Sequence, residues 1–348
     1  MAAIRCCLAA SKLLNNSIKS CVMYRVTRSN HAPPSSDERV LMLREILRRK
    51  KEAGPEKKYH RNTFLEWNYS AELYAFSKRI GENFEGNFLQ QAFTQRSYVV
   101  KQETLNKDLG LDDPDRFLED NRSLAAKGEE LSRNFVARYL RTALPCLPEE
   151  GILHIRDHIL KEDNIAKVLC SIGADELILC TDFPTETQTK VSTFYALVGA
   201  VEASSGPERG SLFVRDFLIT SLSGQDIHAL CMPEDKLGAL SQIFLREGKE
   251  APEPRIISQV GMNSIIPCYR IGLYSEKKFL GSGAGESIQD GIDNAALNVL
   301  WKLWDMPDGK LQFPFDLDVS SVLNNSRSNV PEAEWTSDKV KKQVRPSR

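Results

Sequence analysis

The sequence predicts an α+β protein with two domains, a helical domain followed by a smaller domain of order α-β-β-β-α. Over residues 64–222, apolar residues recur at spacings of three and four, the period of an amphipathic helix. After a break near Pro233 the pattern changes to a short helix, three strand-like runs and a final helix. The 348 residues, 41% of them hydrophobic, are enough for two ordinary domains and their tails.

The N-terminal stretch is biased in charge. Residues 1–36 contain no Asp or Glu but carry five Lys or Arg, with several Ser and Ala. Acid-free, basic leaders of this kind are typical of mitochondrial transit peptides, which we assign to residues 1–30. A tail that lacks acids by chance is the alternative. No apolar run approaches about 18 residues, so we expect no transmembrane helix.

A basic N-terminal extension, residues 31–63, follows the leader. It includes a helix predicted over residues 37–56 and a net charge of +5 between Arg44 and Arg61, whereas residues 71–232 carry −8. A polyanion such as RNA favours the extension over the acidic block. A solvated helix face would give the same pattern. The candidate RNA-binding residues are Arg44, Arg48, Arg49, Lys50, Lys51, Lys57, Lys58 and Arg61.

The helical region is predicted from five amphipathic segments. These are residues 71–81, 87–98, 115–141, 152–172 and 190–203. Eight scattered cysteines form no CxxC pair, which argues against a zinc site and favours unpaired thiols in a reducing compartment.

The second domain is predicted from a change of period. A helix over residues 236–247 precedes three strand candidates, and Ser275-Glu276 gives a hairpin-length link between the last two. The final helix runs over residues 287–304, and Ser287 with Asp290 resembles a capping box at its start. The strand candidates are residues 254–261, 268–274 and 277–285.

This order, with "PEPRIISQVG" and "FLGSGAGESIQDGIDNAALNVLW", resembles a double-stranded-RNA-binding domain. The resemblance implies recognition of A-form shape through phosphates and 2′-hydroxyls. It also implies a phosphate-gripping lysine pair at the last helix, where this chain has Ile288 and Gln289. The family's minor-groove histidine is matched by Ser264. We therefore expect this domain to bind RNA weakly. Lys277 and Lys278 are candidate phosphate contacts, or they are simply exposed hairpin residues.

The helical domain resembles the ribonuclease III family in three stretches, taken in order. They are "FLQQAFTQRSY" (88–98), "NRSLAAKGEEL" (121–131) and "VSTFYALVGAVEA" (191–203). The resemblance implies a ribonuclease III-like domain over residues 64–228, a double-stranded-RNA-binding-like domain over 233–305 and a C-terminal tail over 306–348. We expect the basic tail to stay disordered until it threads into RNA.

The family's catalytic site implied by this resemblance is broken. Ribonuclease III uses Mg²⁺ held by carboxylates on two facing helices, and a hard cation needs several such oxygens. Only Glu129 keeps an acid, and Gln95 stands where the family has histidine. We expect no catalytic residue, no metal and no cofactor, and we expect Gly128 and Gly199 to be close-packing positions. The degenerate positions are Arg122, Ala125, Glu129, Ser192 and Tyr195.

The whole combination resembles the ribonuclease III-like proteins of the mitochondrial large ribosomal subunit. That resemblance implies a structural role in the mitochondrial matrix, in the mitochondrial ribosome. The expected partners are large-subunit ribosomal RNA and other mitochondrial ribosomal proteins, with one contact through the face that ribonuclease III domains use to dimerise. Two alternatives are a Mg²⁺-dependent mitochondrial endonuclease of double-stranded RNA and a free RNA-processing factor.

Overall fold

The computed structural model describes residues 36–54, 61, 65–110, 118–181, 183–306 and 313–344. It divides into two units, Met1–Lys58 and Tyr59–Arg348. The first unit contains the predicted basic helix as α2 (Ser36–Ala53); the predicted leader lies outside the described residues. Among the described residues, none of the helices combines the length and hydropathy that a bilayer span requires.

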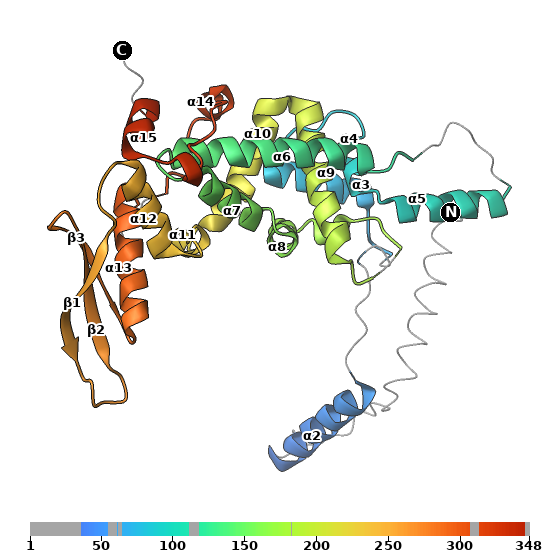
Figure 1. Cartoon of the computed structure of the whole chain (residues 1–348). Helices are drawn as coiled ribbons and strands as arrows, with labels where there is room; N and C mark the ends of the chain where they lie inside the picture. Colours follow the sequence, from blue (N-terminus) through green and yellow to red (C-terminus); the bar gives the residue numbers. More distant parts are fainter. Residues whose placement is uncertain are drawn as a thin grey trace, which may run out of the picture. The chain divides into compact units, whose positions relative to one another are not determined.

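The second unit begins with a domain built from helices, as predicted (Figure 1). Two of the predicted segments are each split into two helices. Thr94 leaves the helical conformation to bridge Leu179, and Lys161 is extended between two helices. The helices are α3 (Tyr69–Ile80), α4 (Phe88–Phe93), α5 (Arg96–Asp108), α6 (Arg122–Ala143), α7 (Glu149–Ile159), α8 (Glu162–Ile172), α9 (Thr187–Ser205), α10 (Pro207–Phe217) and α11 (Ile227–Leu230).

Helices α6 and α9 pack against each other at two glycines. A Cβ atom added to Gly128 would lie 2.0 Å from the carbonyl oxygen of Tyr195, and one added to Gly199 would lie 2.2 Å from that of Leu124. Real Cβ atoms do not approach a backbone oxygen so closely, so only glycine permits this helix spacing. The prediction that both glycines are close-packing positions is confirmed.

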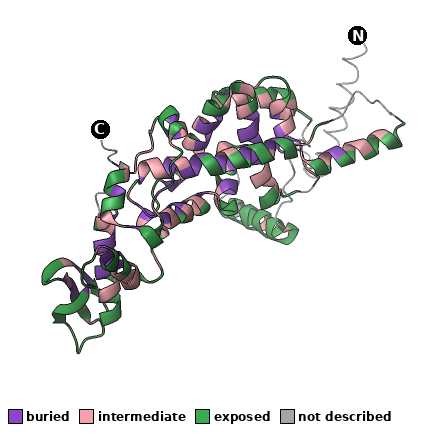
Figure 2. Cartoon of the chain, turned by 45° about the horizontal axis from the view of Figure 1, so that its top comes forward, coloured by how far each residue is buried: buried purple, intermediate pink, exposed green. Residues whose placement is uncertain are grey.

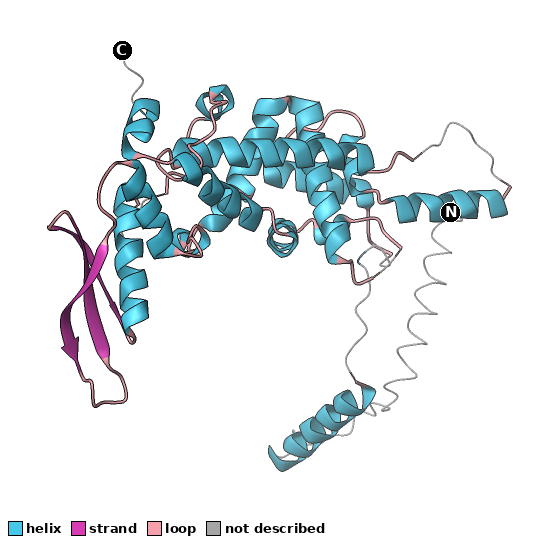
Figure 3. Ribbon diagram, viewed as in Figure 1, coloured by secondary structure: helices cyan, strands magenta, loops and turns pink. Residues whose placement is uncertain are grey.

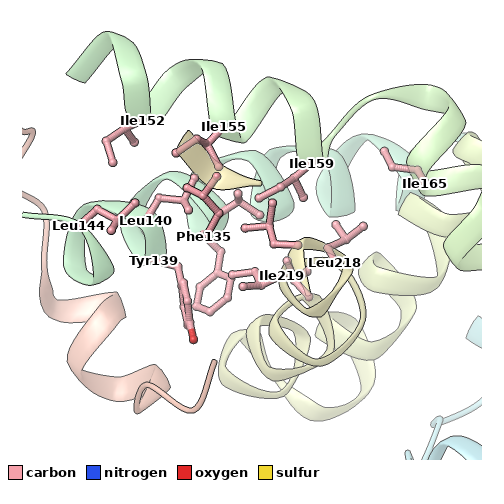
Figure 4. Packing of buried hydrophobic residues seen from close by; sticks show 14 of the residues in the cluster. Phe135, Tyr139, Leu140, Leu144, Ile152, Ile155, Ile159, Ile165, Leu218 and Ile219 are labelled. Atoms are coloured by element: carbon pink, nitrogen blue, oxygen red, sulfur yellow. The ribbon is translucent and has the colours of Figure 1, made fainter. Parts of the chain in front are cut away.

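A second part of the core lies between α6, α7 and the segment after α10 (Figure 4). Phe135 and Tyr139 come from α6, and their ring centroids lie 5.9 Å apart. Ile152, Ile155 and Ile159 project from successive turns of α7 and are fully buried. The spacing of three and four therefore places one apolar face of α7 on α6, as the helical period requires. Figure 2 shows the same contrast along α6, with buried and exposed residues alternating by face.

The second domain has the predicted order α-β-β-β-α (Figure 3). Its sheet is antiparallel in the order β1-β2-β3, and the side chain of Ser287 accepts a hydrogen bond from the Asp290 amide at the start of the last helix. The elements are α12 (Lys236–Arg246), β1 (Glu253–Val260), β2 (Cys268–Ser275), β3 (Lys278–Gly285) and α13 (Ile288–Leu303).

The β2–β3 hairpin differs from the prediction by one residue. Ser275 pairs with Lys278, so the two turn residues are Glu276 and Lys277 rather than Ser275 and Glu276. Both turn residues have positive φ, +51° and +67°. A two-residue turn with positive φ at both positions matches the right-handed twist of the flanking strands, although such turns favour asparagine and glycine.

Helix α13 covers one face of the sheet. Ile271 and Leu273 of β2 are buried on that face. A Cβ atom on Gly283 of β3 would lie 2.2 Å from the backbone nitrogen of Ala295, so glycine lets the helix approach the strand closely.

The described part of the tail is folded, although we expected the tail to be disordered. Between residues 313 and 344 it forms α14 (Val319–Asn324), a 3₁₀ turn (Glu332–Glu334) and α15 (Ser337–Val344). The expectation of disorder is therefore wrong for this stretch. Its apolar residues explain the difference, because Trp335 is only 1% exposed and provides a large buried surface.

Polar contacts fix the tail to both domains. The Asn329 side-chain amide donates to the carbonyl oxygens of Leu144 and Leu147, at 2.9 and 2.8 Å, and the indole of Trp335 donates to the Cys146 carbonyl at 3.0 Å. These acceptors lie between α6 and α7. On the other side, the hydroxyl and amide of Ser337 both donate to Glu247, at the C-terminal end of α12. The tail thus bridges the two domains.

Candidate functional site

The structure brings all five degenerate positions into one surface hollow of about 640 Å³. Arg122, Ala125 and Glu129 lie on one face of α6, one turn apart, and Ser192 and Tyr195 lie one turn apart on α9. The glycine-mediated contact between the two helices sets their separation here, because Gly128 adjoins Glu129 and touches the backbone of Tyr195.

Tyr195 presents a neutral phenol in this hollow. Its side chain is nearly buried, and burial, together with the nearby negative charge of Glu129, raises the pKa of Tyr195 to about 12. The hydroxyl therefore stays protonated at neutral pH and offers no anionic oxygen to a cation. A hard divalent ion prefers carboxylate oxygens, so the substitution removes a ligand of the required charge.

Glu129 is the remaining acid among the five positions, and it has a partner. Its Oε1 lies 3.1 Å from Nη2 of Arg133, one turn along α6. Arg122 and Arg133 both line the hollow. The positive charge of the paired Arg133 opposes the binding of a divalent cation at Glu129 by charge repulsion.

Gln95 occupies the position at which the family resemblance implies a histidine, and its role is structural. Its side-chain amide donates to the hydroxyls of Thr193, at 2.8 Å, and Ser192, at 3.3 Å. The start of α5 is thereby attached to α9. The sequence pattern does not single out Thr193, which is fully buried on α9 and itself donates to the Thr189 carbonyl at 2.8 Å.

Two further acids reach the same hollow from other helices. Asp157 of α7 and Glu162 of α8 line it, although nothing in the linear pattern marks them as neighbours of Glu129. Glu130 and Glu202, the acids nearest to the motif positions in sequence, line a different hollow. Within the described ranges, no group of three or more His, Cys, Asp or Glu side chains is arranged to hold a metal ion.

The structure describes six of the eight candidate bases of the N-terminal extension. Five of them lie on α2, where Arg48 and Arg49 both donate to Glu45 at 3.0 Å. Lys57 and Lys58 lie outside the described residues. Arg61 belongs to the other unit, where its guanidinium donates to Glu176 at 2.6 Å and lies 5.2 Å from the ring of Trp67.

The positions at which the double-stranded-RNA-binding resemblance implies RNA contacts are apolar or polar and already hydrogen-bonded within the domain. Ile288 is 46% exposed at the start of α13, and Gln289 donates to Asp293 at 3.1 Å. In the β1–β2 loop the hydroxyl of Ser264 donates to the Gly261 carbonyl at 2.7 Å, and Ile265 is fully exposed. Lys277 and Lys278 are exposed at the β2–β3 hairpin.

Comparison with known proteins relates both domains to one family. Residues 68–201 match the model described as large ribosomal subunit protein mL44, endonuclease domain, and residues 232–336 match the model described as MRPL44 dsRNA-binding domain. The mL44 protein of Caenorhabditis elegans is 30% identical over 278 residues, which cover 78% of this chain and 68% of that protein. The chain belongs to the mL44 family of large ribosomal subunit proteins.

Ribonucleases of the same superfamily are also similar. Ribonuclease 3 of Enterococcus faecalis is 26% identical over 220 residues, which cover 62% of this chain and 89% of that enzyme. Among solved structures, the nuclease domain of ribonuclease III from Campylobacter jejuni aligns with 42% of this chain and 96% of its own, at 16% identity and a TM-score of 0.36. The second family match extends to residue 336 and so includes Trp335, which the sequence pattern alone assigns to a separate tail.

Proposed function

We propose that this chain is a structural component of the mitochondrial large ribosomal subunit, where it binds ribosomal RNA and neighbouring proteins and supports ribosome assembly and mitochondrial translation. Membership of the mL44 family carries the proposal. The hollow between α6 and α9 supports it, because Ala125, Ser192 and Tyr195 occupy positions where the ribonuclease III resemblance implies carboxylates.

The proposal includes the absence of nuclease activity. Glu129 is paired with Arg133, and Asp157 and Glu162, which also line the hollow, are not arranged with it as the several oxygen ligands that Mg²⁺ or Mn²⁺ needs, within the described residues. The purified chain should leave double-stranded RNA intact with either ion, while an active ribonuclease III in parallel cleaves it. Metal-dependent cleavage that is lost in a Glu129→Ala variant would contradict the proposal and support the endonuclease alternative.

The proposed RNA contacts are electrostatic. They comprise the basic residues of α2, the bases Lys57, Lys58 and Arg61 that follow it in the sequence, and Lys277 and Lys278 at the hairpin. The protein contacts include the helical face that ribonuclease III domains use for dimerisation. Phosphate neutralisation by such lysines and arginines supplies affinity without sequence readout.

The proposed location is the mitochondrial matrix. The acid-free composition of residues 1–36 supports it, because import signals are basic and poor in acids. A fluorescent reporter fused to residues 1–36 should enter the matrix, whereas a matched fusion with its five bases replaced by glutamine should remain cytosolic. A wild-type fusion that stays cytosolic would refute the targeting assignment.

Co-sedimentation is the experiment that separates the proposed function from a free RNA-processing factor. In a sucrose gradient of mitochondrial lysate, the chain should migrate with the large subunit, and it should shift to the top when magnesium is chelated and subunits unfold. A chain that stays in light fractions while other large-subunit proteins sediment would favour the free factor.

A further inference from the structure

The sheet of the second domain has one face that no helix covers among the described residues. Side chains alternate between the faces of a strand, so Ile271 and Leu273 point to α13 while Arg270 and Tyr274 point the other way. The strand register extends this free face across the sheet (Figure 3). Its larger side chains are Arg255 and Ile257 on β1, Arg270 and Tyr274 on β2, and Phe279 on β3.

Two aromatic rings lie side by side on this face. Tyr274 and Phe279 are directly opposite in the register, with ring centroids 5.5 Å apart and an interplanar angle of 62°. Phe279 is 55% exposed, although a phenylalanine ring favours burial. The guanidinium of Arg255 lies 5.6 Å from the centroid of Tyr274. One guanidinium group and two rings therefore form a contiguous cationic and aromatic cluster on this face.

A β-bulge continues that surface toward β1. Ile257 is the extra residue between Ile256 and Ser258, and it leans over the sheet. A Cβ atom on Gly272 would lie 2.7 Å from Cδ1 of Ile257, so the absence of a side chain at Gly272 lets the isoleucine lie flat. Ile257 therefore adds an apolar side chain to the free face beside the cluster.

The charges of the domain are divided between its two sides. Arg255 forms an ion pair with Glu253 at 3.0 Å, but the interaction energy of such an exposed pair is small. Arg270 contacts the Ser282 hydroxyl at 3.5 Å and provides a second cation on this face. By contrast, the start of α13 carries the acids Glu286, Asp290 and Asp293. Phosphates are therefore attracted to the free sheet face and repelled from the start of α13.

We propose that this free sheet face binds an unpaired RNA segment, with bases stacked on Tyr274 and Phe279 and with Arg255 and Arg270 near its phosphates. Aromatic rings interleaved with cations on a sheet are the elements that recognise single strands. A duplex fits poorly, because its base faces are already stacked inside the helix. The inference deepens the proposed function and rests on it only for ribosomal RNA as the source of unpaired nucleotides.

The test measures the affinity of the full chain for two RNAs by fluorescence anisotropy. The probes are a ten-nucleotide single strand of mixed sequence and the blunt duplex of the same sequence. Loss of a stacking ring typically weakens single-strand binding by about fivefold to 150-fold. The double variant Tyr274→Ala/Phe279→Ala should therefore bind the single strand at least about tenfold more weakly, with less than about threefold change for the duplex.

Two further variants make the result specific. Tyr274→Phe/Phe279→Tyr keeps both rings and should bind the single strand within about threefold of the parent, even if the alanine variant unfolds. Tyr74→Ala removes an exposed ring from α3 of the helical domain and should leave both affinities unchanged.

Three outcomes would overturn the proposal. They are an unchanged single-strand affinity in the sheet variant, an equal loss for single strand and duplex, or a loss in the Tyr74→Ala variant as large as in the sheet variant. If the sheet variant binds RNA normally but no longer enters large subunits, the face binds a protein instead. Sedimentation of the parent chain tests the proposed function separately, so the two failures are distinguishable.

Discussion

Replacement of Gly128 by alanine should force α6 and α9 apart. The new Cβ atom would lie 2.0 Å from the Tyr195 carbonyl oxygen and 2.8 Å from the backbone nitrogen of Gly199, and neither backbone atom can rotate away. Relief requires a shift of about 1 Å between two helices whose facing sides are buried. Overpacking of this kind costs about 1–3 kcal/mol or more. Alanine recovers about 1 kcal/mol of helix propensity, and we expect a net loss of about 2 kcal/mol.

Gly210→Ala is the matched control. Gly210 also lies inside a helix, so alanine gains the same propensity, but its Cβ atom would be 3.3 Å from the Glu202 side chain and 3.4 Å from that of Leu131. Urea unfolding followed by circular dichroism should show a lower midpoint for Gly128→Ala and an unchanged or higher one for Gly210→Ala. Equal stability of the two variants would refute the packing argument, and with it the reason given for the helix spacing at the hollow.

Three further predictions concern the tail and the basic helix. Trp335→Ala should lower the free energy of unfolding by about 3–5 kcal/mol, since it leaves a cavity where a fully buried indole ring was packed. A decrease below about 1 kcal/mol in urea unfolding would mean that the tail is not part of the cooperative core. Glu247 is partly buried, which raises its pKa, but hydrogen bonds from Lys249 and Ser337 outweigh burial and lower the pKa overall. The ionised Glu247 therefore contributes to folding stability above its unfolded pKa of about 4.5, and this contribution is lost as pH falls. A Glu247→Gln variant should be less stable than the parent by about 1.5 kcal/mol at pH 7 and should match it near pH 3. A constant stability difference across that range would exclude the charged group as the cause. Glutamine at each of residues 48–51 should weaken ribosomal association and lower its salt slope by about one unit for each phosphate that is no longer neutralised, and unaltered assembly across a salt series would mean that α2 does not bind RNA.

The helical part of the fold follows from local periodicity, and so it could be predicted. Apolar spacing locates α6, α7 and α13, and the Ser287 cap marks the start of α13 within one residue. The break at Thr94 is different, because it depends on a bridge to Leu179, which is 85 residues away and outside any local pattern. The tail shows the same limit. Its polar, proline-containing sequence resembles a disordered segment, but the acceptors that Asn329 satisfies belong to the turn before α7.

The hollow between α6 and α9 could be predicted only where a motif marks it. Helical spacing alone puts Ala125 and Glu129 on one face, and the family resemblance aligns them with Ser192 and Tyr195. The partner of Glu129 is also local, at i+4, and can be read from the sequence. Asp157 and Glu162 could not be predicted, because they reach the hollow from α7 and α8, whose packing no short pattern encodes.

The position of the bridging tail in the sequence imposes an order of events. The residues that join the two domains, from Asn329 to Ser337, follow both domains along the chain. The amide of Asn329 and the indole of Trp335 therefore reach their acceptors only after everything before them has been synthesised. Until then, three carbonyl groups between α6 and α7 and the carboxylate of Glu247 lack these donors. A chain that ends before residue 329 would retain both domains but leave these acceptors exposed. The exposed acceptors would distinguish an incomplete chain from a complete one.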